Sequence, residues 1–175
     1  MLNVIRKFKK SETGVAAIEF ALLIPVMLTT FFGVSEIANY ILAARKVANV
    51  ASSAADLVAQ DTTINTGELN DIMNSLNVVL RPFNPSSATI RITSVVADPN
   101  TGNKTVDWSE ARNIAPRASG SSVTIPNIIS PGQSVIMAEV SFNYQTLFGE
   151  YLTGGMTVND TFYLKPRRST KVERQ

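Results

Sequence analysis

The hydrophobic positions of this chain change their spacing twice between the N-terminus and the C-terminus. From Val15 to Val34 nearly every residue is apolar, and the single charge in that run is Glu19. The next stretch, to about Gln60, keeps small apolar residues at helical spacing. From Ala88 the period drops toward two, which is typical of β-strands. The pattern therefore predicts a membrane-length helix, a helical extension, and a domain that contains a sheet.

One long helix is expected over residues 15–60. Its first part, residues 15–34, has the length that crosses a bilayer core of about 30 Å. Pro25 cannot donate a hydrogen bond to the carbonyl of Ala21, so we expect a kink there. Residues 35–60 are interpreted as an extension that packs through small side chains, with a bare spacer helix as the alternative. The predicted packing stripe is Val34, Ile37, Ala38, Ile41, Ala44, Ala48, Ala51, Ala55 and Val58.

A second, shorter helix is predicted after a break at residues 61–65. Thr66 can cap this helix, and Glu68 lies in its first turn, where a negative charge is favourable. The segment from Arg81 to Pro85 ends it, because it contains two prolines. The predicted buried stripe is Leu69, Ile72, Met73, Leu76 and Leu80.

About four antiparallel strands are expected in the remainder of the chain. They are placed at 89–95, 104–109, 134–144 and 156–164, with a turn at 98–103, a loop at 110–133 and a connection at 147–155. Trp108 is predicted to pack at the end of a hairpin. The late aromatic residues are predicted to be core: Tyr144, Phe148, Tyr151, Phe162 and Tyr163. The fold class is therefore α+β, with the long helix covering one face of the sheet.

Charge is concentrated at the two ends of the chain. Residues 1–14 carry a net charge of +3, and the rest holds 12 basic and 13 acidic residues. Basic residues beside a membrane span stay on the cytoplasmic side, so residues 1–14 are interpreted as a cytoplasmic leader and residues 61–175 as an exported domain. A cleaved secretory signal peptide is the alternative for the N-terminus. A second basic cluster, from Lys165 to Arg174, is interpreted as a solvated tail.

Several function classes lose support because key residue types are missing. The chain has no Cys and no His, which removes the usual general base, the serine triad and His-ligated metal sites. Asp98, Asn100 and Asn103 resemble a calcium loop only faintly, so neither a metal nor a cofactor is expected. The basic leader is not a basic face on a folded domain, so nucleic-acid binding is not expected. The domain's acids, Asp98, Asp107, Glu139 and Asp160, are predicted not to be catalytic.

The most specific motif is the segment from Gly14 to Pro25, Gly-Val-Ala-Ala-Ile-Glu-Phe-Ala-Leu-Leu-Ile-Pro. A carboxylate inside an apolar helix is costly and is read first as functional. This segment resembles the processing site of TadE-like pseudopilins, which belong to the tight-adherence pilus machinery. The resemblance is densest over residues 13–59, and residues 161–167 are similar to the end of these proteins.

The resemblance implies a minor pilin that is cut by a prepilin peptidase and assembled with other pilins. Cleavage between Gly14 and Val15 would make Glu19 the fifth mature residue and Phe20 the sixth, and these two would serve subunit pairing or recognition. The implied location is a bacterial inner membrane, crossed once with the N-terminus inside, or a pilus built from it. The alternative is an uncleaved membrane-anchored envelope protein whose outer domain binds a partner. An anchored enzyme is the weakest hypothesis.

Overall fold

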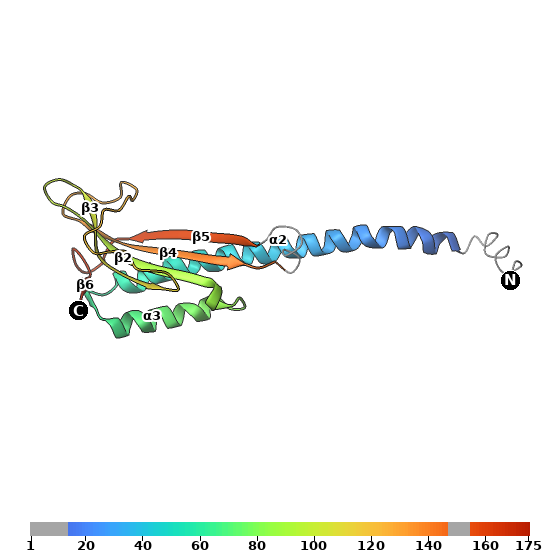
Figure 1. Cartoon of the computed structure of the whole chain (residues 1–175), viewed down its shortest axis with the longest axis horizontal. Helices are drawn as coiled ribbons and strands as arrows, with labels where there is room; N and C mark the ends of the chain where they lie inside the picture. The colour runs from blue at the N-terminus through green and yellow to red at the C-terminus, as the bar shows by residue number, and fades with distance from the viewer. Residues whose placement is uncertain (1–13, 147–154) are drawn as a thin grey trace, which may run out of the picture. The chain divides into compact units, whose positions relative to one another are not determined.

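The structure, a computed structural model, describes residues 14–146 and 155–175 (Figure 1). It consists of two compact units, of which the first ends at Tyr40 and the second begins at Ile41. The boundary falls inside helix α2 (Val15–Ala59), which is continuous over 45 residues. Most of the predicted leader lies outside the described residues, as do Phe148, Tyr151 and nearly all of the predicted connection at 147–155.

The part of α2 that belongs to the second unit forms one wall of the hydrophobic core. Its fully buried residues recur every three or four positions, as a single helical face requires. The predicted stripe was partly wrong, because Ile41 is 47% exposed and Ala44 and Ala48 are only half-buried. The buried face instead includes the larger Val47 and Val50, since burying a valine removes more apolar area from water than burying an alanine.

A second helix, α3 (Thr66–Val79), follows a short strand, β1 (Thr63–Ile64). Its N-cap is Asn65, so the predicted cap at Thr66 was wrong by one residue. Asn65 Oδ1 accepts from the Glu68 backbone N–H at 3.0 Å, and Glu68 Oε2 accepts from the Asn65 N–H at 2.9 Å. This reciprocal pair is a capping box, and it needs the glutamate three residues after the cap. The predicted stripe is buried at Leu69, Met73, Leu76 and Leu80, while Ile72 is half-buried.

The sheet has four antiparallel strands in the order β3-β2-β4-β5. Their bounds are Ala88–Ala97 for β2, Lys104–Arg112 for β3, Ser134–Tyr144 for β4 and Met156–Leu164 for β5. A one-turn 3-10 helix, η2 (Pro85–Ser87), leads into β2. Two helices and a four-stranded antiparallel sheet confirm the predicted α+β class. Strand β3 is longer than predicted: its pairing with β2 continues to Arg112, with a register shift between Ser94 and Val95.

One face of the sheet carries the main core. Ile90 and Ile92 of β2 and Ile136 of β4 are fully buried there, together with the buried faces of α2 and α3. Trp108 lies on this face in the middle of β3, opposite Ser94, and not at a hairpin end as predicted. Its indole Nε1–H donates to the Val172 carbonyl at 2.8 Å, which attaches the end of the chain to the sheet.

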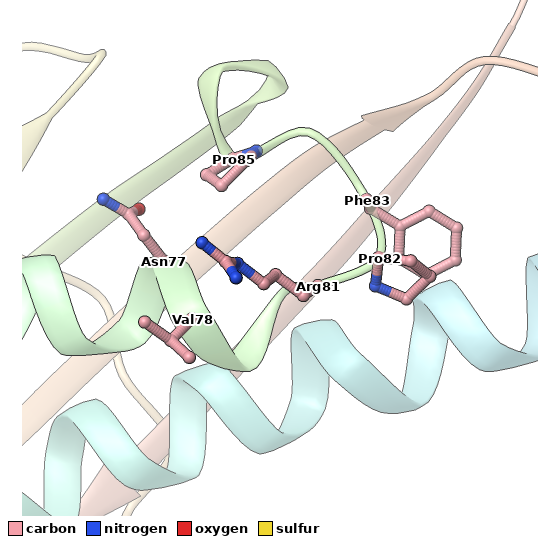
Figure 2. Close-up of a pocket in the computed structure, with 6 residues that line it drawn as sticks. All are labelled: Asn77, Val78, Arg81, Pro82, Phe83 and Pro85. Atoms are coloured by element: carbon pink, nitrogen blue, oxygen red, sulfur yellow. The ribbon is translucent and has the colours of Figure 1, made fainter.

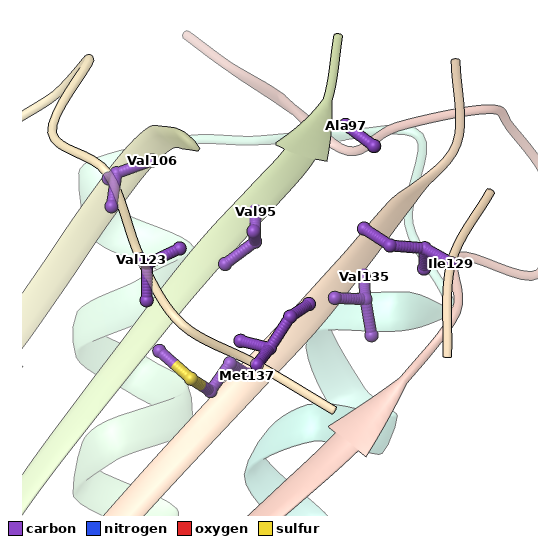
Figure 3. Close-up of a cluster of buried hydrophobic side chains, with 8 residues drawn as sticks. Val95, Ala97, Val106, Val123, Ile129, Val135 and Met137 are labelled. Carbon is purple, nitrogen blue, oxygen red and sulfur yellow. The ribbon is translucent and has the colours of Figure 1, made fainter. Parts of the chain in front are cut away.

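A second, smaller core lies on the opposite face of the same sheet. Figure 3 shows apolar side chains of the strands meeting residues of the segment between β3 and β4. This cluster consists of Val95, Ala97, Val106, Val123, Ile125, Ile129, Val135 and Met137. The predicted loop at 110–133 is therefore irregular after Arg112, but it covers the sheet with its own core residues.

The C-terminal segment is folded onto the domain, so the interpretation as a solvated tail was wrong. Strand β6 (Glu173–Arg174) pairs in parallel with β1, and Val172 is fully buried. Arg167 pairs with Asp56 of α2, and Arg174 Nη2 lies 2.8 Å from Glu110 Oε2. Carboxylates on other elements thus bind three of the five basic residues that suggested a free tail, since Lys171 also lies 3.6 Å from Asp107.

The prediction for the late aromatic residues holds only in part. Tyr144 is buried, and the ring of Phe83 packs edge-on against it with ring centroids 5.9 Å apart. Tyr163 is half-buried against the smaller core. Phe162, which was expected in the core, is 39% exposed because β5 is an edge strand.

A charge cluster holds the covering segment against the sheet. Glu139 of β4 accepts from Arg91 Nε at 2.8 Å and from Arg117 Nη2 at 2.8 Å, and Arg117 belongs to the segment after β3. Partial burial raises the pKa of Glu139, but the hydrogen bonds and charges of the two arginines outweigh it and hold the pKa below its usual value. The carboxylate is therefore a structural anion and is not set up to act as a general base at neutral pH.

We expect Glu139→Gln to lower the free energy of unfolding at pH 7 by about 1–3 kcal/mol, because it leaves two partly buried guanidinium groups without their anion. A depressed pKa contributes stability above the unfolded-state value of about 4.3 and loses it as pH falls through the folded-state value. The difference between the variant and the wild type should therefore shrink below pH 4.3. Urea unfolding of the full chain in detergent between pH 7 and pH 3 measures this. Glu173→Gln is the control, and a difference that is independent of pH would contradict the assignment.

The capping box at the start of α3 gives a second stability test. Asn65→Ala removes the acceptor for the Glu68 N–H and should lower the free energy of unfolding by about 1 kcal/mol. Asn70→Ala is the matched control, because Asn70 is an exposed position inside the same helix. Alanine has a higher helix propensity than asparagine, so this control should be neutral or slightly stabilising. Equal losses of unfolding free energy in the two variants would show that the Asn65 cap does not stabilise α3 specifically.

Candidate functional site

The candidate site is the N-terminal part of α2, which lies in the first unit. Large apolar side chains are exposed around the whole circumference of this helix, among them Ile18 at 64%, Leu22 at 71% and Phe31 at 66%. The most apolar window has a mean hydropathy of 2.1, and no residue in it is buried. The helix is long and apolar enough to cross a membrane. Among the described residues nothing covers this apolar surface, and lipid or other helices would supply such a cover.

Gly14 stands immediately before the first residue of α2. A Cβ atom built on Gly14 would meet no other atom within 4 Å, and its backbone does not adopt the left-handed conformation that favours glycine. Neither packing nor backbone geometry within the described residues thus requires glycine here. The absence of a side chain leaves the peptide bond between Gly14 and Val15 open to close approach by another molecule.

Glu19 lies one helical turn after Val15, on the same side of the helix. Residues four apart in an α-helix are neighbours on its surface, so the backbone nitrogen of Val15 and the carboxylate of Glu19 share one face. The side chain of Glu19 is exposed, and within residues 14–146 and 155–175 it forms no ion pair. Phe20 is next to it in sequence, 59% exposed, and points to a different side of the helix. The segment therefore presents one acidic group in an otherwise apolar surface.

Pro25 lies within α2, and the helix continues through it. The hydroxyl groups of Thr29 and Thr30 donate to backbone carbonyls of the preceding turn, at Pro25 and Val26 respectively, each at 2.8 Å. Both polar side chains are thus satisfied by their own helix, which suits an apolar surrounding. The kink expected at Pro25 stays a prediction.

Several described acids of the second unit stabilise local structure. Asp98 accepts hydrogen bonds from the backbone N–H groups of Asn100 and Thr101, and these bonds lower its pKa. This is an Asx turn that shapes the β2–β3 hairpin. Asp107 lies 3.6 Å from the Lys171 ammonium group. In the part of the chain that the structure describes, no three acidic side chains are grouped so that they could hold a metal ion.

A hollow of about 580 Å³ lies at the end of α3, and Figure 2 shows the side chains that line it. Its walls come from Asn77, Val78, Arg81, Pro82, Phe83 and Pro85. Arg81 is the one ionisable group among them, so the hollow offers neither a general base nor a nucleophile. Sequence reasoning did not indicate this hollow, nor the cluster of Arg91, Arg117 and Glu139, because both depend on long-range packing.

Comparison with known proteins identifies the N-terminal segment. A family model described as TadE-like protein matches residues 14–56. No curated protein and no solved structure matches the chain. The matched range begins at the glycine before α2, includes the exposed apolar surface with Glu19, and ends within the part of α2 that enters the domain core. Over residues 14–56 this chain is similar to TadE-like proteins, as its sequence resemblance suggested.

Proposed function

We propose that this protein is a minor pilin or pseudopilin of a tight-adherence pilus. It is a substrate of a prepilin peptidase, which cuts between Gly14 and Val15, and it assembles with other pilins through the N-terminal part of α2. The observation that carries this proposal is the exposed apolar helix with a single acidic residue five positions after an unconstrained glycine. The TadE-like match over the same residues supports it.

In this proposal the protein first crosses the inner membrane once. The basic leader holds the N-terminus and the Gly14–Val15 bond at the cytoplasmic face, and the second unit is exported. The apolar circumference of the helix allows it to exchange lipid for neighbouring pilin helices, because both surroundings are apolar. Dispersion contacts and matched polar groups, not the hydrophobic effect alone, then decide which helices associate.

Cleavage creates the polar group that Glu19 can match. The new α-amino group on Val15 has an ordinary pKa of about 7.7–8.0 and is largely protonated near neutral pH. When two helices are staggered, the amino group of one chain can meet the carboxylate of its neighbour. Either charge alone is unfavourable in an apolar surrounding, and pairing offsets part of that cost. A wrong register leaves both unpaired, so the pair selects register as well as adding affinity.

Processing is tested with Gly14→Leu, which places a branched side chain beside the scissile bond. We expect cleavage to be abolished and membrane insertion to be retained. Intact-mass analysis of protein extracted from cells that make the cognate peptidase should find wild-type protein starting at Val15 and the variant at full length. A reporter enzyme that works only outside the cytoplasm, fused after Gln175, measures insertion and orientation in both.

Gly33→Leu is the matched control for processing, because a side chain at Gly33 also meets nothing within 4 Å. This control should be inserted and cleaved normally. Full-length wild-type protein in the presence of an active peptidase would contradict the proposal and favour the alternative, an uncleaved membrane-anchored envelope protein. Activity of a second reporter, one that works only in the cytoplasm, fused at the same place would contradict the orientation.

The role of Glu19 is tested by three substitutions that separate charge from shape. Glu19→Ala and Glu19→Gln should be inserted and largely cleaved but should lose co-purification with partner pilins, because both lack the negative charge. Glu19→Asp keeps the charge one methylene group shorter and should retain part of the assembly. The measurement compares cleavage and co-purification side by side for each variant. Normal assembly of the Gln variant would show that Glu19 acts through fit or peptidase recognition.

A further inference from the structure

The two edge strands of the sheet are protected to very different degrees. The outer edge of β3 is partly covered by the segment that follows it: the Val106 N–H donates to Ser121, the Gly120 N–H donates to Val106, and the Val123 N–H donates to Lys104. Strand β3 also carries four charged residues, Lys104, Asp107, Glu110 and Arg112. Covering segments and charges are the usual means by which proteins prevent a foreign strand from pairing with an edge.

The edge of β5 has little of this protection. Within the described residues, no backbone hydrogen bond joins β5 to any segment other than β4. The strand contains no proline, no bulge and one charged residue, Asp160. Met156 and Phe162 are 40% and 39% exposed. Every second residue of an edge strand directs its backbone N–H and C=O groups away from the sheet, so β5 offers a row of free ladder positions.

A hollow lies beside this edge on the helix-facing side of the sheet. Its volume is about 330 Å³. One wall is formed by Ser52, Ser53 and Asp56 of α2. The other is formed by Phe162 and Leu164 of β5 and by Arg167, which follows the strand. The salt bridge from Arg167 to Asp56 occupies the two charged groups that line it. Because successive side chains of a strand point to opposite faces, a strand added next to β5 would direct alternate side chains into this hollow.

Asp160 determines which strand can pair here. It is the central residue of β5, and its carboxylate lies beside the strand backbone, where it accepts from the Thr161 N–H at 2.8 Å. If two copies of this chain paired antiparallel about the centres of their β5 strands, their Asp160 side chains would be directly opposite. Like charges in that position are destabilising, whereas opposite charges are favourable. In this centred register a second copy is disfavoured, and a strand with a basic residue opposite Asp160 is favoured.

We propose that β5 is a docking edge for an extended segment of a different protein, which adds to the sheet as a fifth strand. The segment carries Lys or Arg opposite Asp160 and places a neighbouring side chain in the hollow beside Phe162. Main-chain hydrogen bonds supply the affinity, and the charge and the hollow supply the selectivity. This contact is separate from the N-terminal helix, so it would operate whether or not the protein is a pilin.

The test uses two fluorescein-labelled peptides and the full chain in detergent. Both peptides alternate Val and Thr over seven positions, and they differ only at the centre, which is Lys in one and Glu in the other. Fluorescence anisotropy should show that the wild type binds the Lys peptide about three- to tenfold more tightly than the Glu peptide. Asp160→Lys should reverse this order, and Asp160→Asn should remove the preference. Asp71→Lys, which changes an exposed acid on α3, should leave the wild-type preference unchanged.

Three outcomes would overturn the proposal. The first is that neither peptide binds the wild type at millimolar concentration. The second is that both bind equally, which would indicate nonspecific adhesion. The third is that Asp160→Lys keeps the wild-type order while its thermal unfolding shows that it is folded. If the Lys variant fails to fold, Asp160→Asn still tests the proposal, because it changes few atoms at this position and should remove the preference for the Lys peptide.

Discussion

An apolar helix surface that no described residue of the chain covers is the physical constraint behind the proposed function. Between Val15 and Val34 the side chains project in every direction, and none of the most apolar window is buried. Water is an unfavourable surrounding for such a surface, so its stable states are those in which lipid or other helices surround it. Glu19 then becomes the one polar group whose cost must be offset in each of those states. The charge of Glu19 therefore influences which helices associate and in which register.

The second unit depends on the C-terminal part of the same helix. The buried face of α2 from Ala43 to Ala59 is the wall against which α3 and the sheet bury their apolar residues. The C-terminal segment then attaches to the structure through Val172, the hydrogen bond from Trp108, and the pairing of β6 with β1. These contacts join residues that are far apart in the sequence. A fold held this way fixes the end of α2 without any disulfide, since the chain has no cysteine.

The elements with strong local patterns could be predicted from sequence. The long helix, α3 and the four main strands were expected close to their observed positions, because hydrophobic period and turn residues determine them locally. The errors concern residues whose environment is set by distant segments. The basic C-terminal cluster was taken for a solvated tail, but Arg167 pairs with Asp56 and Arg174 pairs with Glu110, and no local rule could predict these pairs. Trp108 was misplaced for the same reason, since its partner Val172 is 64 residues away.

For the candidate site, sequence was more informative than for the packing of the domain. The segment from Gly14 to Phe20 is recognisable because its chemistry is local: a glycine, a short apolar spacer and an acid in an apolar helix. The structure adds that Gly14 has no packing role and that Glu19 has no ion-pair partner within the described residues. The edge of β5 could not have been found this way, because which strand lies at an edge depends on the order of all four.

In the proposed assembly, the amino group of one chain pairs with the carboxylate of Glu19 on another. A zero-length carbodiimide, which joins an amine and a carboxylate only when they are in contact, tests it directly in assembled material. With isotope-labelled protein mixed into the assembly, mass spectrometry distinguishes links between chains from links within one chain. We expect mass spectrometry to find an amide bond between the Glu19 peptide of this chain and the N-terminal peptide of a neighbouring pilin. Links only within one chain, or no link at Glu19 in intact assemblies, would contradict it.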